Sequence, residues 1–218
     1  MAVCMKLWQL ESLLQQLDGF ERPKLALEQY VTPAHIAARL LHTAQVTFGD
    51  IAGKAVADLG CGPAVLAAGA AALGALSVLA VDIDEDALAI ARANLEEAEL
   101  STVELVQADV THLAQLWRRP VDTVLTNPPF GTKRNAGADM RFLEAALSLA
   151  DSAVYSLHKR STRRHVQRQA ELWGARASVV AELRYDLPST YGFHRKASVD
   201  IEVDLWRTVP AQRSGPAA

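Results

Sequence analysis

The chain of 218 residues contains few cysteines, few aromatic residues and no long uninterrupted hydrophobic run. Its two cysteines, Cys4 and Cys61, are too few for a disulfide scaffold or, by themselves, for a tetrahedral zinc site, and this scarcity is typical of a reducing compartment. The longest apolar stretch, residues 64–80, is interrupted by Gly69 and Gly74 and is too short to span a bilayer. We therefore expect an intracellular protein with no membrane partner and no resident metal.

Internal repeats and Ser/Gly-rich linkers are also missing, so the sequence shows no domain boundary. Half of the residues are hydrophobic, which is enough to fill a core and excludes a disordered chain. We expect one domain over residues 1–209, in which residues 1–48 form an N-terminal helical extension and residues 49–209 form the core. The small and polar residues 210–218 are expected to be a disordered tail.

The charges are unevenly distributed, although the net charge is only −3. Residues 1–130 contain 16 acidic and 8 basic side chains, whereas residues 131–218 contain 9 acidic and 14 basic side chains. The segment 152–170 has five basic residues and no acidic one. Such a segment is either ordinary solvated surface or a face that meets a polyanion, such as a nucleic acid.

Short apolar runs alternate with helical patterns after residue 49, which predicts crossover connections and a mainly parallel sheet. The last two runs have no helix between them, so one of these two strands is expected to run antiparallel. Thr32 and Pro33 resemble a helix start, with a capping hydroxyl followed by proline. Asp84 is expected to cap the helix that follows the second expected strand. The expected strands are 55–59, 77–81, 103–106, 121–125, 153–157, 177–183 and 198–206. The predicted fold is a doubly wound α/β domain.

Polar residues stand at the ends of four successive expected strands. In a doubly wound sheet, ligands bind at the carboxyl ends of the strands, so these residues are candidates for a binding site. A Gly-rich turn lets the backbone approach a ligand closely, and a carboxylate after the second strand suits ribose hydroxyls. The dinucleotide fingerprint has a similar layout but needs a third glycine, where this chain has Val65. The four clusters are Asp58 with Gly60 and Gly62, then Asp82, Asp109 and Asn127.

The sequence Asn127-Pro128-Pro129-Phe130 follows the fourth expected strand. The two prolines fix φ at successive positions and predict a rigid, extended loop. Such a loop would present the Asn127 amide oxygen and the Pro128 carbonyl as acceptors beside the ring of Phe130. Two acceptors and a ring face can hold a planar –NH₂ group. The motif therefore favours an enzyme that methylates an amino group over a nicotinamide-dependent oxidoreductase.

The chain resembles the S-adenosylmethionine-dependent amino-methyltransferases and, more narrowly, the methyltransferase-like family that makes N6-methyladenosine in small-subunit ribosomal RNA. The broad resemblance rests on residues 57–62, 82–88 and 127–133. The narrow one also includes Thr32 and residues 27–30, 153–159, 181–188 and 198–205, of which 155–159 and 184–188 are the most specific. It implies a Rossmann-like class I methyltransferase fold with a seven-stranded sheet and an antiparallel strand near the C-terminus. It also implies in-line attack of adenine N6, in 18S-type RNA, on the methyl group of S-adenosyl-L-methionine.

The resemblance assigns roles residue by residue. The expected catalytic residues are Asn127, Pro128, Pro129 and Phe130. The residues expected to bind the methyl donor are Gln29, Thr32, Asp58, Gly60, Gly62, Pro63, Val65, Asp82, Asp109 and Val110. Basic residues near these motifs are expected to contact RNA phosphates, and Phe193 is either a stacking or a core residue. The candidates for RNA binding are Lys133, Arg134, Lys159, Arg160, Arg163, Arg164, Phe193, Arg195 and Lys196.

The resemblance further implies a protein partner, a small zinc-binding activator that adds a strand to the sheet of the enzyme. We expect the segment Val103 to Val110 to be the edge strand that receives it. A nuclear, nucleolar and cytoplasmic location is expected. Two alternatives stay open, namely an enzyme that methylates a glutamine amide in a protein and a catalytically silent RNA- or partner-binding module. The basic segment argues against the first, and the four polar clusters argue against the second.

Overall fold

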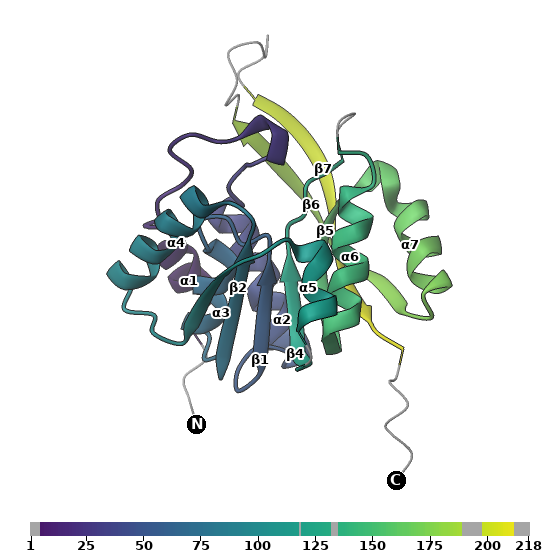
Figure 1. The fold of residues 1–218 in the computed structure, drawn as a ribbon, viewed down its shortest axis with the longest axis horizontal. Coiled ribbons are helices and arrows are strands. Elements are labelled where there is room, and N and C mark those ends of the chain that lie inside the picture. The colour runs from purple at the N-terminus through teal and green to yellow at the C-terminus, as the bar shows by residue number, and fades with distance from the viewer. Residues whose placement is uncertain (1–4, 118, 132–134, 189–197, 212–218) are drawn as a thin grey trace.

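The computed structural model describes residues 5–117, 119–131, 135–188 and 198–211. One seven-stranded sheet crosses the described residues in the order β3-β2-β1-β4-β5-β7-β6 (Figure 1). Every neighbouring pair is parallel except the two pairs made by β7, which runs antiparallel to β5 and β6. The predicted fold class is thereby confirmed. The strands are β1 (Ala55–Leu59), β2 (Ser77–Asp82), β3 (Val103–Gln107), β4 (Val121–Thr126), β5 (Ala150–Lys159), β6 (Arg176–Pro188) and β7 (Ser198–Val209).

Helices cover both faces of the sheet (Figure 1). Buried residues of α1, α2, α3 and α4 form one hydrophobic core with the first face, and those of α5, α6 and α7 form a second core with the other face. The helices are α1 (Leu7–Leu14), α2 (Ala34–Phe48), α3 (Val65–Ala72), α4 (Glu85–Glu97), α5 (Val110–Leu116), α6 (Ala138–Leu149) and α7 (Arg163–Leu172), with short 3-10 turns η1 (Leu25–Leu27) and η2 (Arg160–Thr162). No described helix is both long and apolar enough to cross a membrane.

The central strands are continuous apolar runs because helices cover them on both sides. In β1 and β2 every residue after the first is buried, and β4 has one half-buried residue. Parallel strands that are buried on both faces lack the apolar–polar alternation of a half-exposed sheet. The helix cap predicted at Asp84 is confirmed, because its carboxylate accepts the Asp86 backbone N–H at the start of α4.

The expected hydroxyl cap at Thr32 is wrong. Helix α2 begins at Ala34, Pro33 is its N-cap residue, and no side chain caps this end. The Thr32 hydroxyl instead accepts a hydrogen bond from the Asn127 amide at 2.8 Å. A partner that is distant in the sequence has taken the oxygen that a local cap would use.

The expected edge strand is shorter than Val103 to Val110. Strand β3 lies at the edge of the sheet, as predicted, but it ends at Gln107, and Val110 is the first residue of α5. The cause is Asp109, whose carboxylate accepts the Thr111 backbone N–H at 2.8 Å and thereby starts the helix. Only residues 103–107 are available to pair with an added strand.

Strands β6 and β7 form a long hairpin that extends beyond the other strands at the upper edge of the sheet (Figure 1). The predicted strand 177–183 leaves out residue 176 and residues 184–188 of β6, and the predicted strand 198–206 leaves out residues 207–209 of β7. Tyr185 lies on the added length of β6 and is completely buried.

Candidate functional site

A cavity of about 370 Å³ lies at the carboxyl ends of the central parallel strands, and the N-terminal segment 26–32 forms part of its wall. This volume is within the usual range for small-molecule sites. All of the residues predicted to bind the methyl donor line the cavity, and so do Asn127 and Pro129. The fold therefore brings the four polar clusters together. Their contact with a donor stays a prediction.

The turn after β1 needs its two glycines. Gly60 and Gly62 have φ values of +72° and +52°, a region that favours glycine. A Cβ atom would come within 2.8 Å of the Phe142 ring at the first position and of the Phe20 ring at the second. Ala64 is also left-handed, with φ of 69°, just before α3. The turn thus exposes backbone rather than side chains to the cavity.

Two acidic side chains at this turn are buried. The Asp82 carboxylate accepts the backbone N–H groups of Gly62 at 2.8 Å and of Asp84 at 2.9 Å, and burial raises its pKa. The Asp58 Oδ2 atom accepts the Ala67 N–H at 2.9 Å, whereas the buried Oδ1 atom has no partner among the described residues. Burial raises the pKa of Asp58 to about 7, and the Asp82 charge adds to this effect. An unpartnered carboxylate oxygen beside a cavity fits a ligand that carries a positive charge.

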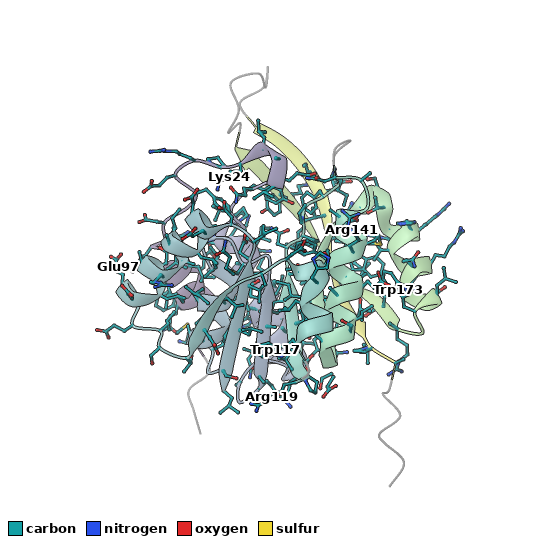
Figure 2. The ribbon with its side chains drawn as sticks, viewed as in Figure 1. Lys24, Glu97, Trp117, Arg119, Arg141 and Trp173 are labelled. Atoms are coloured by element: carbon teal, nitrogen blue, oxygen red, sulfur yellow. The ribbon has the colours of Figure 1, made fainter. Side chains whose placement is uncertain are left out.

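The N-terminal segment is fixed over the cavity through the start of α4. Lys24, labelled in Figure 2, places its Nζ atom 2.5 Å from the Asp84 carboxylate. The Gln29 Nε2 atom donates to the same carboxylate at 2.6 Å, and its Oε1 atom accepts the Lys24 N–H at 2.7 Å. Hydrogen bonds to Lys24 and Gln29 lower the pKa of Asp84, which opposes the effect of burial. Gln29 therefore lines the cavity with both ends of its amide bonded to the protein.

Asp109 has a double role. Its Oδ1 atom accepts both the backbone N–H and the hydroxyl of Thr111, and the hydroxyl contact is the main cause of its lowered pKa. Its Oδ2 atom lies 3.4 Å from His112 Nδ1. The residue caps α5 and also lines the cavity.

The side chain of Asn127 is held at one end and free at the other. Its Nδ2 atom donates to the Thr32 hydroxyl at 2.8 Å and to the Tyr185 hydroxyl at 3.1 Å. Its Oδ1 atom is buried and has no partner among the described residues. Because residue 127 lines the cavity, this oxygen is a candidate acceptor for a substrate amino group.

The rest of the motif differs from the expected open platform. The Pro128 carbonyl accepts the Tyr30 hydroxyl at 3.0 Å. The Phe130 ring is only 8% exposed, because the Tyr30 ring stacks on it with 5.2 Å between centroids and 30° between planes. Lys159 Nζ lies over the same ring, 5.7 Å from its centroid. Tyr30 thus covers the carbonyl and the ring that were expected to face a substrate.

Sequence reasoning missed the two tyrosines of this site. Tyr30 and Tyr185 meet edge to face with 5.8 Å between ring centroids, and both touch Phe130. Each lies in a stretch that carries the family resemblance, residues 27–30 and 181–188. The signal that could have identified them was the presence of a tyrosine in a stretch that matches the family.

The predicted RNA-binding residues fall into three groups. Arg163 pairs with Asp204 and Glu182, and Arg160 pairs with Glu182 and Glu202, so their charges are matched by carboxylates of β6 and β7. Lys159 is half-buried beside the ring of Phe130, whereas Arg164 is exposed on α7 and has no carboxylate partner in the described part of the chain. The remaining candidates lie outside the described residues, namely Lys133, Arg134, Phe193, Arg195 and Lys196.

The strand order, the Gly-rich turn after β1 and the acidic residues at the next strand ends define the chain as a Rossmann-like methyltransferase. The methyltransferase small domain family matches residues 36–153. The chain is 57% identical to the rRNA N(6)-adenosine-methyltransferase METTL5 of Danio rerio, over 94% of this chain and 100% of the relative. It is 55% identical to the rRNA N(6)-adenosine-methyltransferase Mettl5 of Drosophila melanogaster, over 93% of this chain and 96% of the relative.

A crystal structure agrees with these relatives. The Pyrococcus horikoshii protein PH1948, described as a candidate RNA methyltransferase, superposes with a TM-score of 0.84 at 34% identity. The match covers 98% of this chain and all of the other. The chain belongs to the family of rRNA N(6)-adenosine methyltransferases.

Proposed function

We propose that this protein transfers a methyl group from S-adenosyl-L-methionine to N6 of an adenosine in small-subunit, 18S-type ribosomal RNA. The observation that carries the proposal is the buried and unpartnered Oδ1 atom of Asn127 at the end of β4, beside the cavity. Family membership supports the reaction, since two relatives of nearly full coverage are named as enzymes of this type.

The residues of the cavity fit the donor. Asp58 would pair with a positive charge of the donor through its unpartnered oxygen, and Asp82 would accept ribose hydroxyls through lone pairs that the backbone leaves free. Asp109 and Val110 would contact the adenine ring of the donor. S-adenosyl-L-methionine supplies an activated methyl group on a sulfonium, so positioning of the substrate and exclusion of water are what the protein must add.

The Asn-Pro-Pro-Phe loop would hold the target amine. Asn127 Oδ1 accepts one N6 hydrogen. The Pro128 carbonyl accepts the other once the Tyr30 hydroxyl that bonds it has moved away, which leaves the nitrogen lone pair for attack on the methyl group. As the new N–C bond forms, the bond between the methyl carbon and sulfur breaks and its electron pair stays on sulfur, which gives S-adenosylhomocysteine as the leaving group. The extra proton on the nitrogen is then lost to solvent. The target base stacks on Phe130 only after Tyr30 or Lys159 moves from the ring, because both lie against it.

The adenosine has to be unpaired or flipped out of its stack to reach this loop, at a cost of a few kcal/mol. Lys159 is next to the loop, and Arg164 is exposed five residues after the end of β5. We expect these two side chains to bind phosphates near the target. Arg160 and Arg163 would contribute less, since carboxylates already pair with them.

The substitution Asn127→Ala tests the function. Small-subunit rRNA from cells that lack the protein is digested, and N6-methyladenosine is measured by mass spectrometry after complementation with each variant. We expect wild type to restore the modification and Asn127→Ala to fail, with donor affinity nearly unchanged by calorimetry. Gln16→Ala, an exposed amide that does not line the cavity, is the matched control. If small-subunit rRNA from cells lacking the protein kept its full N6-methyladenosine content, the proposed substrate would be contradicted. An active Asn127→Ala would contradict the role of the amide.

We further propose that a small zinc-binding activator protein adds a strand to β3. This strand is at the sheet edge and none of its residues is fully buried. The Thr102 carbonyl and the Ala108 N–H bond toward β2, so the alternation along a parallel strand directs the backbone groups of Val103 and Leu105 outward. An open edge of this kind is a template for strand addition.

Leu105→Pro removes one outward N–H and tests this interface. Gel filtration of the two proteins together should give one complex for wild type and separate peaks for the variant, while the thermal midpoint of the variant alone confirms that it is folded. Retention of the complex by a folded Leu105→Pro protein would refute strand addition at β3.

A protein that modifies rRNA in this way would work in the nucleus, the nucleolus or the cytoplasm.

A further inference from the structure

The amide of Asn127 has two ends with opposite chemistry. Its oxygen can only accept a hydrogen bond, and its –NH₂ group can only donate. A substrate amino group needs an acceptor, so an amide turned by 180° would oppose two donors and repel the substrate. The site therefore requires a device that selects one orientation of this side chain.

We propose that Tyr185 and Thr32 are positioning residues that hold the Asn127 amide with its oxygen toward the substrate amino group. The inference rests on the proposed function and deepens it. The Nδ2 atom has both of its hydrogens engaged, one by the Thr32 hydroxyl at 2.8 Å and one by the Tyr185 hydroxyl at 3.1 Å. The Oδ1 atom is left without a described partner.

A backbone carbonyl gives this arrangement its direction. The Tyr185 hydroxyl donates to the Val31 carbonyl at 3.1 Å, and a carbonyl can only accept. Since the single proton of Tyr185 is used there, its oxygen is an acceptor toward Asn127. Only the –NH₂ end of the amide can satisfy it. The hydrogen-bond chain from Val31 through Tyr185 to Asn127 thus runs one way.

Burial keeps water from competing with this chain. Tyr185 is fully buried and Thr32 is 9% exposed. The Tyr185 ring is also held edge-on against Tyr30 and Phe130, with centroid distances of 5.8 Å and 6.0 Å. Removal of the hydroxyl alone therefore leaves the ring packing in place, which makes Tyr185→Phe a clean probe.

The test is a double-mutant cycle. In wild type, Tyr185→Phe should lower kcat by about tenfold, the worth of one hydrogen bond in orientation, with little change in donor Kd or in KM for rRNA. In Asn127→Asp, both ends of the side chain are acceptors, so the same change should lower kcat less than twofold. An equal loss in both backgrounds would mean a merely structural role and would overturn the proposal.

Two controls separate orientation from packing. Tyr155 is a second fully buried tyrosine whose hydroxyl bonds Asp50, and it does not line the cavity. Tyr155→Phe should leave kcat within about twofold of wild type, because this hydroxyl does not orient the Asn127 amide. Thr32→Val should reproduce the loss, and Thr32→Ser, which restores a hydroxyl, should recover most of it. Failure of Thr32→Ser to recover activity in a folded protein would count against the role of that oxygen.

A readout without turnover distinguishes failure of this inference from failure of the proposed function. The side-chain amide of Asn127 is assigned by ¹⁵N NMR as the signal lost in Asn127→Asp, and its hydrogen exchange is measured in the absence of RNA. Exchange should be slow in wild type and at least about tenfold faster in Tyr185→Phe, since one protecting hydrogen bond is lost. Equal exchange in both proteins would overturn the proposal even if the enzyme methylates rRNA, whereas slow exchange in a protein without rRNA activity would contradict only the function.

Discussion

Donor binding should depend on pH through Asp58. This carboxyl group is 1% exposed, and burial raises its pKa to about 7 in the unliganded protein. A positively charged group of the bound donor, placed beside the Asp58 Oδ1 atom that has no partner among the described residues, would favour the ionised form of Asp58. Binding then requires loss of the proton, so the apparent Kd should be about tenfold weaker near pH ~6 than near pH ~8. This factor corresponds to about 1.4 kcal/mol.

Calorimetry with S-adenosylhomocysteine measures this effect without turnover. Titrations near pH ~7 in two buffers of different ionisation enthalpy should show release of about half a proton per ligand bound. Asp58→Asn should bind with a nearly constant Kd across the same range, which separates Asp58 from His112 and other groups. A wild-type Kd that does not change with pH, or an equal pH dependence in Asp58→Asn, would refute the reasoning.

The raised pKa of Asp58 has the opposite effect on the stability of the unliganded protein, which it increases at low pH. A folded-state pKa that lies above the unfolded value contributes stability at low pH, and this contribution is lost as the pH rises through the folded-state pKa. For Asp58 the window runs from about 4, the ordinary value of Asp, to about 7. Urea denaturation should therefore show a free energy of unfolding that falls less steeply with pH in Asp58→Asn than in wild type.

Three further predictions concern the donor site, the C-terminal hairpin and the RNA surface. Asp82→Ala should weaken S-adenosylhomocysteine by about tenfold or more in calorimetry, through loss of hydrogen bonds to ribose and to the backbone. Asp204→Ala, at a fully buried carboxylate, should cost about 1–3 kcal/mol in urea denaturation, whereas the exposed Glu202→Ala should cost less than about 1 kcal/mol; equal losses would contradict the pairing argument. Arg164→Glu should raise KM for rRNA more strongly at low salt, and Arg92→Glu, on α4, should leave KM unchanged.

The parts of the fold and site that depend on local pattern were predictable from the sequence. The strand ends with Asp58, Asp82 and Asn127 are encoded by apolar runs that stop at polar residues, and the doubly wound arrangement brings such ends together. The length of the C-terminal strands was underestimated, because residues 184–188 and 207–209 have no periodicity that separates them from the segments that follow them.

Contacts between distant residues could not be predicted in this way. Thr32 has the local features of a helix cap, yet it binds Asn127, which is 95 residues away. The arginines of the basic segment looked free, but Arg163 meets Asp204 from another strand. The local sequence does not indicate which distant residue will form a hydrogen bond or an ion pair with a given side chain. These contacts nevertheless decide which polar groups are left to bind a ligand or RNA.

The proposed dependence of Asn127 on Tyr185 bears on when the protein becomes active during its own synthesis. Val31 and Tyr185 are 154 positions apart, so the hydrogen bond between them joins the beginning of the chain to its penultimate strand. The four strands around the donor cavity leave the ribosome well before β6 does. In the proposed role of Tyr185, the amide of Asn127 therefore acquires its fixed orientation only after translation is nearly finished.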